Sequence, residues 1–268
     1  MKPVDFAFDQ PATLAQASTM LATEGARAMG GGQSLGPMLN FRVARPARIV
    51  ALHGLAECQG VEDATDALTL GASTSHAAIE DGRTPDLPGG ILSRIAANIA
   101  YRAVRTRGTM GGSLCHADPG ADWLCTLGAL GALVLTWTPR GGRMVPLSGF
   151  VTGAFRTVLQ PGEIVQAIRI PRPGAGFGWG YVKACRKPGE FAHAMCAVLL
   201  DPTQGVRRMV IGATGGPPVV LEGNRADPAA VEGALEGAGL GPVERRMQAV
   251  IAGRAMEQAM QAHRGTRA

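Results

Sequence analysis

Two glycine-rich stretches of similar composition carry most of the recognisable chemistry in this sequence. The first is Gly-Gly-Gly-Gln-Ser at residues 30–34, and the second is Thr-Met-Gly-Gly-Ser at residues 109–113. Consecutive glycines expose successive backbone N–H groups that can enclose an anion, and a neighbouring hydroxyl adds a further donor. One such stretch is more often only a turn. Two of them, each near the start of an apolar segment, suggest two walls around a diphosphate.

Neither stretch matches the common phosphate-binding fingerprints. The patterns GxGxxG and GxxxxGK[ST] are both absent from residues 30–34 and 109–113 and their surroundings, so a phosphate-bearing cofactor must be held by another fold. The five cysteines have no CxxC spacing, which argues against zinc or an iron–sulfur cluster bound by this chain.

His116 and Asp118 directly follow the second glycine stretch and raise the question of an acid–base pair or a metal site. The favoured interpretation is that they cap the following helix or order the loop. Asp122, a few residues later, is equally consistent with a solvated helix residue when considered alone.

Composition excludes several classes of protein. A hydrophobic content of 46% with 18% charged residues is typical of a globular chain. The longest apolar run, residues 127–137, is shorter than the roughly 20 residues that cross a bilayer. The net charge is +5, but the arginines are scattered and aromatic residues make up only 4%, so we expect no binding of nucleic acid. The start of the chain has no apolar signal region, and we expect a cytoplasmic protein with reduced thiols.

The periodicity of apolar residues predicts an α+β protein. A glycine- and proline-rich stretch at residues 171–180 is the expected boundary, and the strands that follow it are expected to form an antiparallel sheet. The predicted strands lie near residues 4–8, 27–29, 47–52, 66–72, 132–138, 163–171, 181–187, 190–201 and 206–213. The predicted helices lie near residues 11–25, 74–82, 87–100, 121–130, 228–236 and 242–261.

Both glycine stretches resemble the flavin-binding segments of one known family. Residues 29–52, MGGGQSLGPMLNFRVARPARIVAL, are similar to the first such segment in the medium subunit of molybdenum hydroxylases. Residues 105–123, RTRGTMGGSLCHADPGADW, are similar to the second. GEIVQAIRIP, YVKACRKPGEFAHAMCAV and ERRMQAVIAGRAMEQAM continue the resemblance in family order, so that it covers nearly the whole chain. The family includes flavoprotein subunits of carbon monoxide dehydrogenase and of xanthine dehydrogenase-like enzymes.

The resemblance implies a fold and a cofactor. It implies an α+β fold, in which FAD is held by a domain of the vanillyl-alcohol-oxidase (PCMH) type with two subdomains, expected at residues 1–54 and 55–172. A smaller α/β C-terminal domain is expected at residues 173–268. Gly30 and Gly36 depart from the usual alanine and leucine, and the region between Gly223 and Val243 looks shorter than usual.

The resemblance also implies which residues hold FAD. Residues 31–35 and 109–113 are expected on either side of the diphosphate, with Gly111 and Gly112 lacking side chains because a phosphate occupies that space. Asp122 is expected at the adenosine half. The complete set of expected cofactor-binding residues is Gly31, Gly32, Gln33, Ser34, Leu35, Thr109, Met110, Gly111, Gly112, Ser113, Asp122, Val165, Lys183 and Phe191.

The last three residues of that set are expected near the flavin. Val165 and Lys183 match positions that contact it, and Phe191 matches an aromatic position near its ring system. An alternative for Lys183 and Lys187 is an exposed strand edge, which basic residues often protect. Trp123 is expected in the core or an interface rather than in a cofactor stack.

By resemblance, the chain is an electron-transfer subunit. A large subunit would carry molybdopterin, a small subunit would carry two-iron two-sulfur clusters, and electrons would pass from them to FAD in this chain and on to an external acceptor. We expect a dimer of heterotrimers, no metal in this chain and no catalytic residue of its own. Two alternatives are a self-contained FAD-dependent oxidase, against which no added substrate domain is evident, and a non-catalytic nucleotide-binding subunit. The substrate would be chosen by another chain.

Overall fold

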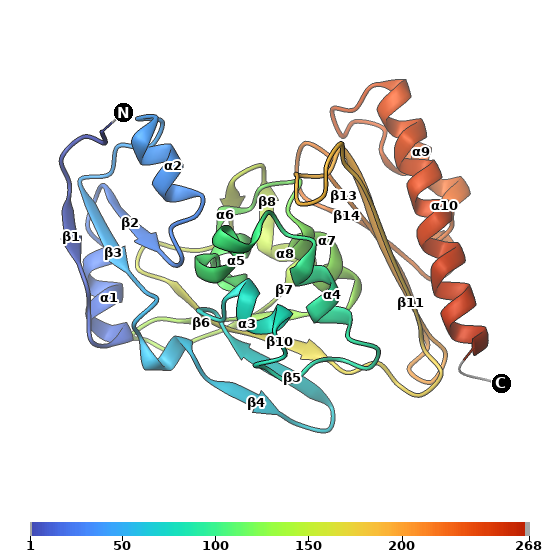
Figure 1. Ribbon diagram of the computed structural model, residues 1–268, viewed down its shortest axis with the longest axis horizontal. Coiled ribbons are helices and arrows are strands. Elements are labelled where there is room, and N and C mark those ends of the chain that lie inside the picture. Colours follow the sequence, from blue (N-terminus) through green and yellow to red (C-terminus); the bar gives the residue numbers. More distant parts are fainter. Residues whose placement is uncertain (1, 266–268) are drawn as a thin grey trace.

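The computed structural model describes residues 2–265. It arranges them around three main sheets that follow one another along the chain, with one small two-stranded sheet besides (Figure 1). The first sheet has the order β1-β3-β2 and is parallel. Helix α1 (Leu14–Leu21) connects β1 to β2 and begins where the Thr13 hydroxyl accepts a hydrogen bond from the N–H of Gln16. The remaining elements of this part are β1 (Ala7–Asp9), β2 (Ala26–Met29), α2 (Leu35–Asn40) and β3 (Arg48–Ala51).

The second sheet is antiparallel, with the order β4-β5-β10-β6-β7. Short helices cover it and enclose the largest apolar core, which includes Trp123 and Phe150. Its strands are β4 (Val61–Asp63), β5 (Ala67–Gly71), β6 (Leu133–Trp137), β7 (Met144–Pro146) and β10 (Ile164–Pro171), with a small pair β8 (Val151–Gly153) and β9 (Arg156–Thr157). The helices are η1 (Ala56–Cys58), α3 (His76–Glu80), α4 (Ile91–Ala97), α5 (Arg102–Arg107), α6 (Met110–His116), α7 (Asp122–Ala129) and α8 (Leu147–Phe150).

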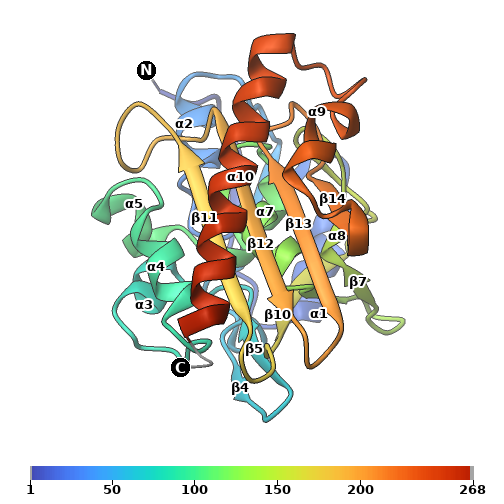
Figure 2. The ribbon, with the colours of Figure 1, turned by 90° about the vertical axis from the view of Figure 1, so that its right-hand side faces the viewer.

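The third sheet is antiparallel in the order β11-β12-β13-β14, and the long helix α10 lies across its outer face (Figure 2). Gly178 and Gly180 allow this contact: a Cβ at Gly180 would lie 1.9 Å from the carbonyl oxygen of Ala255. The elements are β11 (Gly178–Ala184), β12 (Ala194–Asp201), β13 (Val206–Gly212), β14 (Val219–Glu222), η2 (Gly223–Arg225), η3 (Pro228–Ala230), α9 (Val231–Ala234) and α10 (Pro242–Gly265). No helix within residues 2–265 is both long and apolar enough to span a membrane.

Helix α7 joins the second and third sheets, and every one of its residues is buried. Trp123 and Leu127 pack into the core of the second sheet. Cys125 and Ala129 pack against β12 and β13 of the third sheet, where the Cys125 thiol lies 3.1 Å from the carbonyl oxygen of Val210. A helix that is buried on every side needs such a position between two layers. The N-terminus of α7, where Asp122 lies, is therefore placed at the junction of the two sheets.

The sequence predicted most of these elements but misjudged the second glycine stretch. Gly111 and Gly112 lie in helix α6 and not in a turn. Gly111 has no side chain because α6 packs directly on the end of β5: a Cβ there would lie 2.5 Å from the Cβ of Ala72. Helices α2, α5 and α8 and strands β4, β7, β8, β9 and β14 were also not predicted. The helix predicted at 228–236 is a short 3₁₀ turn followed by α9.

A buried histidine lies beneath the second glycine stretch. His76, at the start of α3, accepts a hydrogen bond of 3.2 Å on its Nδ1 from the indole N–H of Trp123. Burial, and next the nearby charge of Arg105, lower the pKa of His76 to about 4. A Cβ on Gly108 would lie 2.9 Å from the imidazole, so the ring fits closely under that residue. His76 is thus a neutral packing residue near neutral pH.

We expect His76 to make the chain acid-sensitive. Because the folded pKa is lower than the usual value of 6.5, the unfolded chain takes up the proton first, so stability is present above pH 6.5 and is lost as the pH falls towards 4. The loss should be on the order of 3 kcal/mol. His76→Gln, which keeps an acceptor for Trp123, should remove that part of the pH dependence in urea unfolding at pH 4.5 and 7. If the free energy of unfolding changed by the same amount between pH 4.5 and pH 7 in both proteins, His76 would not titrate in this way.

Candidate functional site

The two glycine stretches, distant in sequence, contact each other directly. A Cβ on Gly31 would lie 1.7 Å from the carbonyl oxygen of Arg107, so only glycine allows the two backbones to approach this closely. A Cβ on Gly30 would lie 2.8 Å from the hydroxyl oxygen of Thr109. The structure thus brings residues 30–35 and 107–113 to one place.

The loop at the N-terminus of α2 offers a row of free donors. Within residues 2–265, the backbone N–H groups of residues 31–35 make no hydrogen bond, whereas the next N–H, that of Gly36, bonds to the carbonyl of Gly32 at 2.8 Å. Gly32 has a φ of 74°, in the left-handed region that favours glycine. Such a row of N–H groups at a helix start fits the oxygens of a phosphate.

The second stretch contributes differently from the expectation. Its backbone N–H groups are already used: Met110 bonds to the Thr74 carbonyl, Gly111 to the Ala72 carbonyl and Gly112 to the Thr109 hydroxyl, at 2.9, 2.9 and 3.1 Å. The space beside Gly111 is filled by Ala72, so the expectation that a phosphate explains this glycine is wrong.

The donors that remain in this stretch are hydroxyls. The Thr109 oxygen accepts from Gly112, which leaves its proton to donate, and the Ser113 hydroxyl makes no hydrogen bond in the described part of the chain. Of the other expected residues here, Met110 is a fully buried core residue, and the Gln33 amide bonds only to the Gly31 carbonyl, at 3.4 Å. A diphosphate fits this arrangement, with most donors on the first loop.

Asp122 and Lys183 form one buried cluster with Tyr181. The Lys183 ammonium lies 3.0 and 3.1 Å from the two carboxylate oxygens, and the Tyr181 hydroxyl donates to Asp122 Oδ1 at 2.7 Å. Only 9% of the Lys183 side chain and 5% of the Asp122 side chain are exposed. Burial raises the pKa of the Asp122 carboxyl, and the charge of Lys183 opposes this. Asp122, expected at the adenosine half of FAD, and Lys183, expected near the flavin, are thus direct partners of each other.

A cavity of about 350 Å³ opens beside this cluster. It lies where β11 and the loop after it approach the end of α4. Its lining is rich in positive charge, since Lys183, Arg186 and Lys187 all contribute. The other lining residues are Asn98, Tyr181, Cys185, Pro188 and Gly189. This positive charge favours an anionic ligand in the cavity.

The remaining expected residues fall in two different environments. Phe191 is 59% exposed and lies over Gly120, just before α7, so its ring is available at the surface near Asp122. Val165 is buried in the core of the second sheet beside a β-bulge. Its neighbour Gln166 accepts a hydrogen bond from the N–H of Ala72, which connects this bulge to the start of α6.

His116 and Asp118 do not form a pair that could act in catalysis. The His116 ring lies 5.1 Å from that of Phe155, and burial lowers its pKa, as does Arg27, against the opposite effect of Asp118. Asp118 accepts a hydrogen bond of 2.9 Å from the N–H of Gly120, which orders the loop before α7. The expectation that these residues order the loop is confirmed for Asp118.

Sequence reasoning missed Tyr181 and Arg105. Tyr181 precedes Lys183 by two residues on a strand, so both side chains point to the same face, and this spacing could have identified it. Arg105 pairs with Glu80, 25 residues earlier in the sequence, and no local pattern reveals this partner.

Comparison with known proteins identifies similar chains. A family described as the FAD binding domain in molybdopterin dehydrogenase matches residues 4–173. The carbon monoxide dehydrogenase medium chain of Afipia carboxidovorans is 36% identical over 209 residues, which cover 76% of this chain and 72% of that one. The caffeine dehydrogenase subunit beta of a Pseudomonas species is 34% identical over 203 residues, covering 75% and 69%. Among solved structures, reconstituted CO dehydrogenase from Oligotropha carboxidovorans superposes with a TM-score of 0.86 at 30% identity, over 98% of this chain and 100% of that chain.

The buried ion pair predicts a compensating pair of substitutions. Lys183→Met leaves the Asp122 carboxylate buried without its cation and should lower the free energy of unfolding by about 3 kcal/mol or more. Adding Asp122→Asn removes the unpaired charge while keeping an acceptor for Tyr181, so the double variant should be more stable than Lys183→Met alone. Chemical denaturation measures both. Lys187→Met is the control and should change the free energy of unfolding little. If the double variant lost as much stability as the two single variants together, the pairing of Asp122 with Lys183 would be contradicted.

Proposed function

The chain belongs to the family of FAD-binding domains of molybdopterin dehydrogenases, and we propose that it is the flavoprotein subunit of a molybdenum-containing hydroxylase or dehydrogenase. In this proposal it takes electrons from an iron–sulfur subunit to FAD and passes them to an external acceptor. The single observation that carries the assignment within this chain is the row of unbonded N–H groups at residues 31–35 beside the hydroxyls of Thr109 and Ser113.

These residues would hold the diphosphate of FAD. The N–H row supplies donors, and the bare backbones of Gly31 and Gly32 let phosphate oxygens approach. We assign the cluster of Asp122, Tyr181 and Lys183, and the cavity beside it, to the ribityl and flavin part. When bound, FAD supplies two-electron redox chemistry that ordinary side chains lack. The role of this chain is to bind it, orient it and shield it from water.

The division of the chain follows the same proposal. Residues 1–54 and 55–172 form the two subdomains of a FAD-binding domain of the vanillyl-alcohol-oxidase (PCMH) type, and residues 173–268 form the C-terminal domain. The first and second sheets fall within the first two ranges and the third sheet within the last. The family match that ends at residue 173 supports the second boundary.

The electrons come from other chains in this proposal. Relatives are called a medium chain or a subunit beta, which are names for parts of larger assemblies. The partners are a large subunit with molybdopterin and a small subunit with two-iron two-sulfur clusters, assembled as a dimer of heterotrimers. All five cysteines of this chain are free thiols, which supports a location in the reducing cytoplasm.

FAD binding is the first test. The purified chain should bind about one FAD and turn yellow. Gly31→Ala should weaken FAD binding by about tenfold or more, the equivalent of about 1.4 kcal/mol, because its Cβ displaces the Arg107 carbonyl and separates the two stretches. Gly36→Ala is the matched control, because a Cβ there meets nothing within 4 Å. Titration followed by flavin fluorescence measures both. Equal affinity of all three proteins would remove this loop from the site.

Electron delivery is the second test. Expression of the tagged chain with its genomic neighbours should recover a complex that contains molybdenum and iron together with flavin. Organic substrate should bleach the flavin absorbance quickly in that complex and not in the isolated chain. Full-rate bleaching of the isolated chain would instead establish a self-contained oxidase and contradict the subunit assignment.

A further inference from the structure

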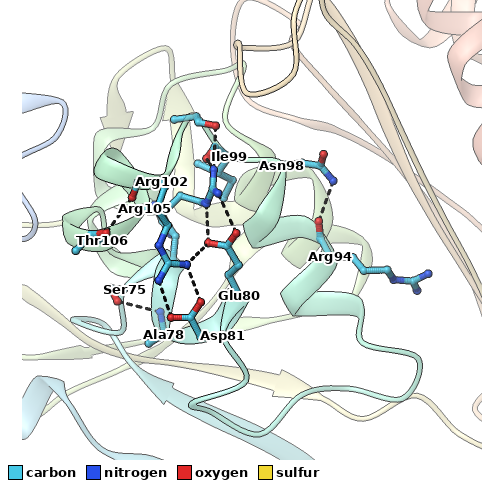
Figure 3. A network of polar contacts seen from close by, with 12 residues as sticks. Ser75, Ala78, Glu80, Asp81, Arg94, Asn98, Ile99, Arg102, Arg105 and Thr106 are labelled. Atoms are coloured by element: carbon cyan, nitrogen blue, oxygen red, sulfur yellow. Dashed lines mark hydrogen bonds and ion pairs between the residues drawn. The ribbon is translucent and has the colours of Figure 1, made fainter.

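All three guanidinium nitrogens of Arg105, on α5, donate hydrogen bonds that join the side chain of Glu80 on α3 to the backbone just before α5 (Figure 3). Its Nε and Nη2 donate to the two carboxylate oxygens of Glu80 at 2.7 and 2.8 Å. Its Nη1 donates at 3.0 Å to the carbonyl oxygens of both Ile99 and Ala100. Two-point pairing of this kind fixes the direction of an arginine as well as its position.

One of the two carbonyls that Arg105 holds belongs to Ala100, which contacts Gly189 in the wall of the cationic cavity. Ala100 has a φ of 45°, which is rare for a residue other than glycine, and its N–H donates to the carbonyl of Gly189 at 3.0 Å. Gly189 lines the cavity, and a Cβ there would lie 2.3 Å from the Ala100 carbonyl oxygen. Asn98, two residues before Ala100, also lines the cavity. Arg105 therefore fixes the segment against which the loop of residues 185–189 rests.

The C-terminus of α5 contacts the loop of residues 31–35. Arg107, the last residue of α5, presents its carbonyl to Gly31. The N–H of His76 donates to the carbonyl of Gly108 at 2.9 Å. Both ends of helix α3 therefore contact α5: His76, its first residue, bonds to Gly108, and Glu80, its last residue, bonds to Arg105. Helix α5 spans the distance between the loop at residues 31–35 and the cationic cavity.

Arg102, in the same network, is far more exposed than Arg105. Arg102 bonds to Glu80 and Asp81 at 2.6–2.8 Å, yet 52% of its side chain is exposed, against 12% for Arg105. Exposed ion pairs contribute little because water screens them. Arg102 also makes no side-chain hydrogen bond to the backbone near the cavity. It therefore serves as an internal comparison for Arg105.

We propose that Arg105, held by Glu80, is a positioning residue that keeps the cationic cavity at a set distance and orientation from the loop of residues 31–35. This inference rests on the proposed function, in which both parts bind one FAD molecule. A ligand with two joined halves gains affinity from its second half only when the two sites match its length. Disturbing Arg105 should thus weaken FAD binding without harming either half of the site.

Variants on both sides of the Ala100–Gly189 contact provide the test. Glu80→Gln and Arg105→Lys weaken the hold of Arg105 on Ala100, and Gly189→Ala disrupts the contact between Ala100 and Gly189 from the cavity side. Each should weaken FAD binding about tenfold in fluorescence titrations. The double variant Glu80→Gln with Gly189→Ala should weaken FAD binding about tenfold and not a hundredfold, because both changes break the same contact. Arg102→Gln is the control and should bind FAD as the unmodified chain does.

ADP provides a readout that general loss of structure would not give. It carries the diphosphate but no flavin, so its affinity, measured by calorimetry, should be equal in the unmodified chain and in each variant. An equal loss of ADP and FAD affinity, or fully additive losses of FAD affinity in the double variant, would overturn the inference. Unchanged FAD affinity in folded Glu80→Gln and Arg105→Lys would do the same and leave the proposed function intact. Failure of the unmodified chain to bind FAD would instead count against the proposed function.

Discussion

The contact between the Gly31 backbone and the Arg107 carbonyl is the constraint on which the candidate site depends. It joins the first sheet to the helices of the second at a distance that no side chain permits. Because β2 ends at Met29 and α2 begins at Leu35, the loop between them has little freedom once Gly31 is fixed. Its N–H groups consequently stay close together and make no hydrogen bond within the described residues. Preorganised donors of this kind bind an anion without a further ordering cost.

The two glycine stretches resemble each other in sequence and differ in physical role. In the first, residues 31–35 leave their donors free, and in the second, protein carbonyls and the Thr109 hydroxyl have already taken them. Gly111 allows α6 to lie against Ala72, and Gly31 allows α5 to lie against the loop. The second stretch is thus chiefly a support, which places Thr109 and Ser113 beside the first.

Local patterns predicted most of the longer strands and the long helices because alternation and helical spacing are local properties, but they missed the strands β4, β7, β8, β9 and β14. Strand β10, for example, is predicted at residues 163–171 and observed at Ile164–Pro171. The contacts of Gly111 with Ala72 and of Arg105 with Glu80 could not be predicted, since these partners lie far away in the sequence. The ion pair of Asp122 and Lys183 was missed for the same reason, although both residues were expected in the site. Family resemblance predicted which residues hold FAD, whereas the contacts between those residues required the structure.

Helix α7 has a consequence for how the chain is made. During synthesis it leaves the ribosome well before β12 and β13, against which Cys125 and Ala129 pack. At ordinary rates of translation this interval is on the order of seconds. Once β10 has followed, the second sheet can form, but the side of α7 that carries Cys125 and Ala129 still faces water until β12 and β13 are made. A nascent chain halted in this interval is a natural substrate for a chaperone, and a fragment that stops near residue 172 exposes the same surface permanently.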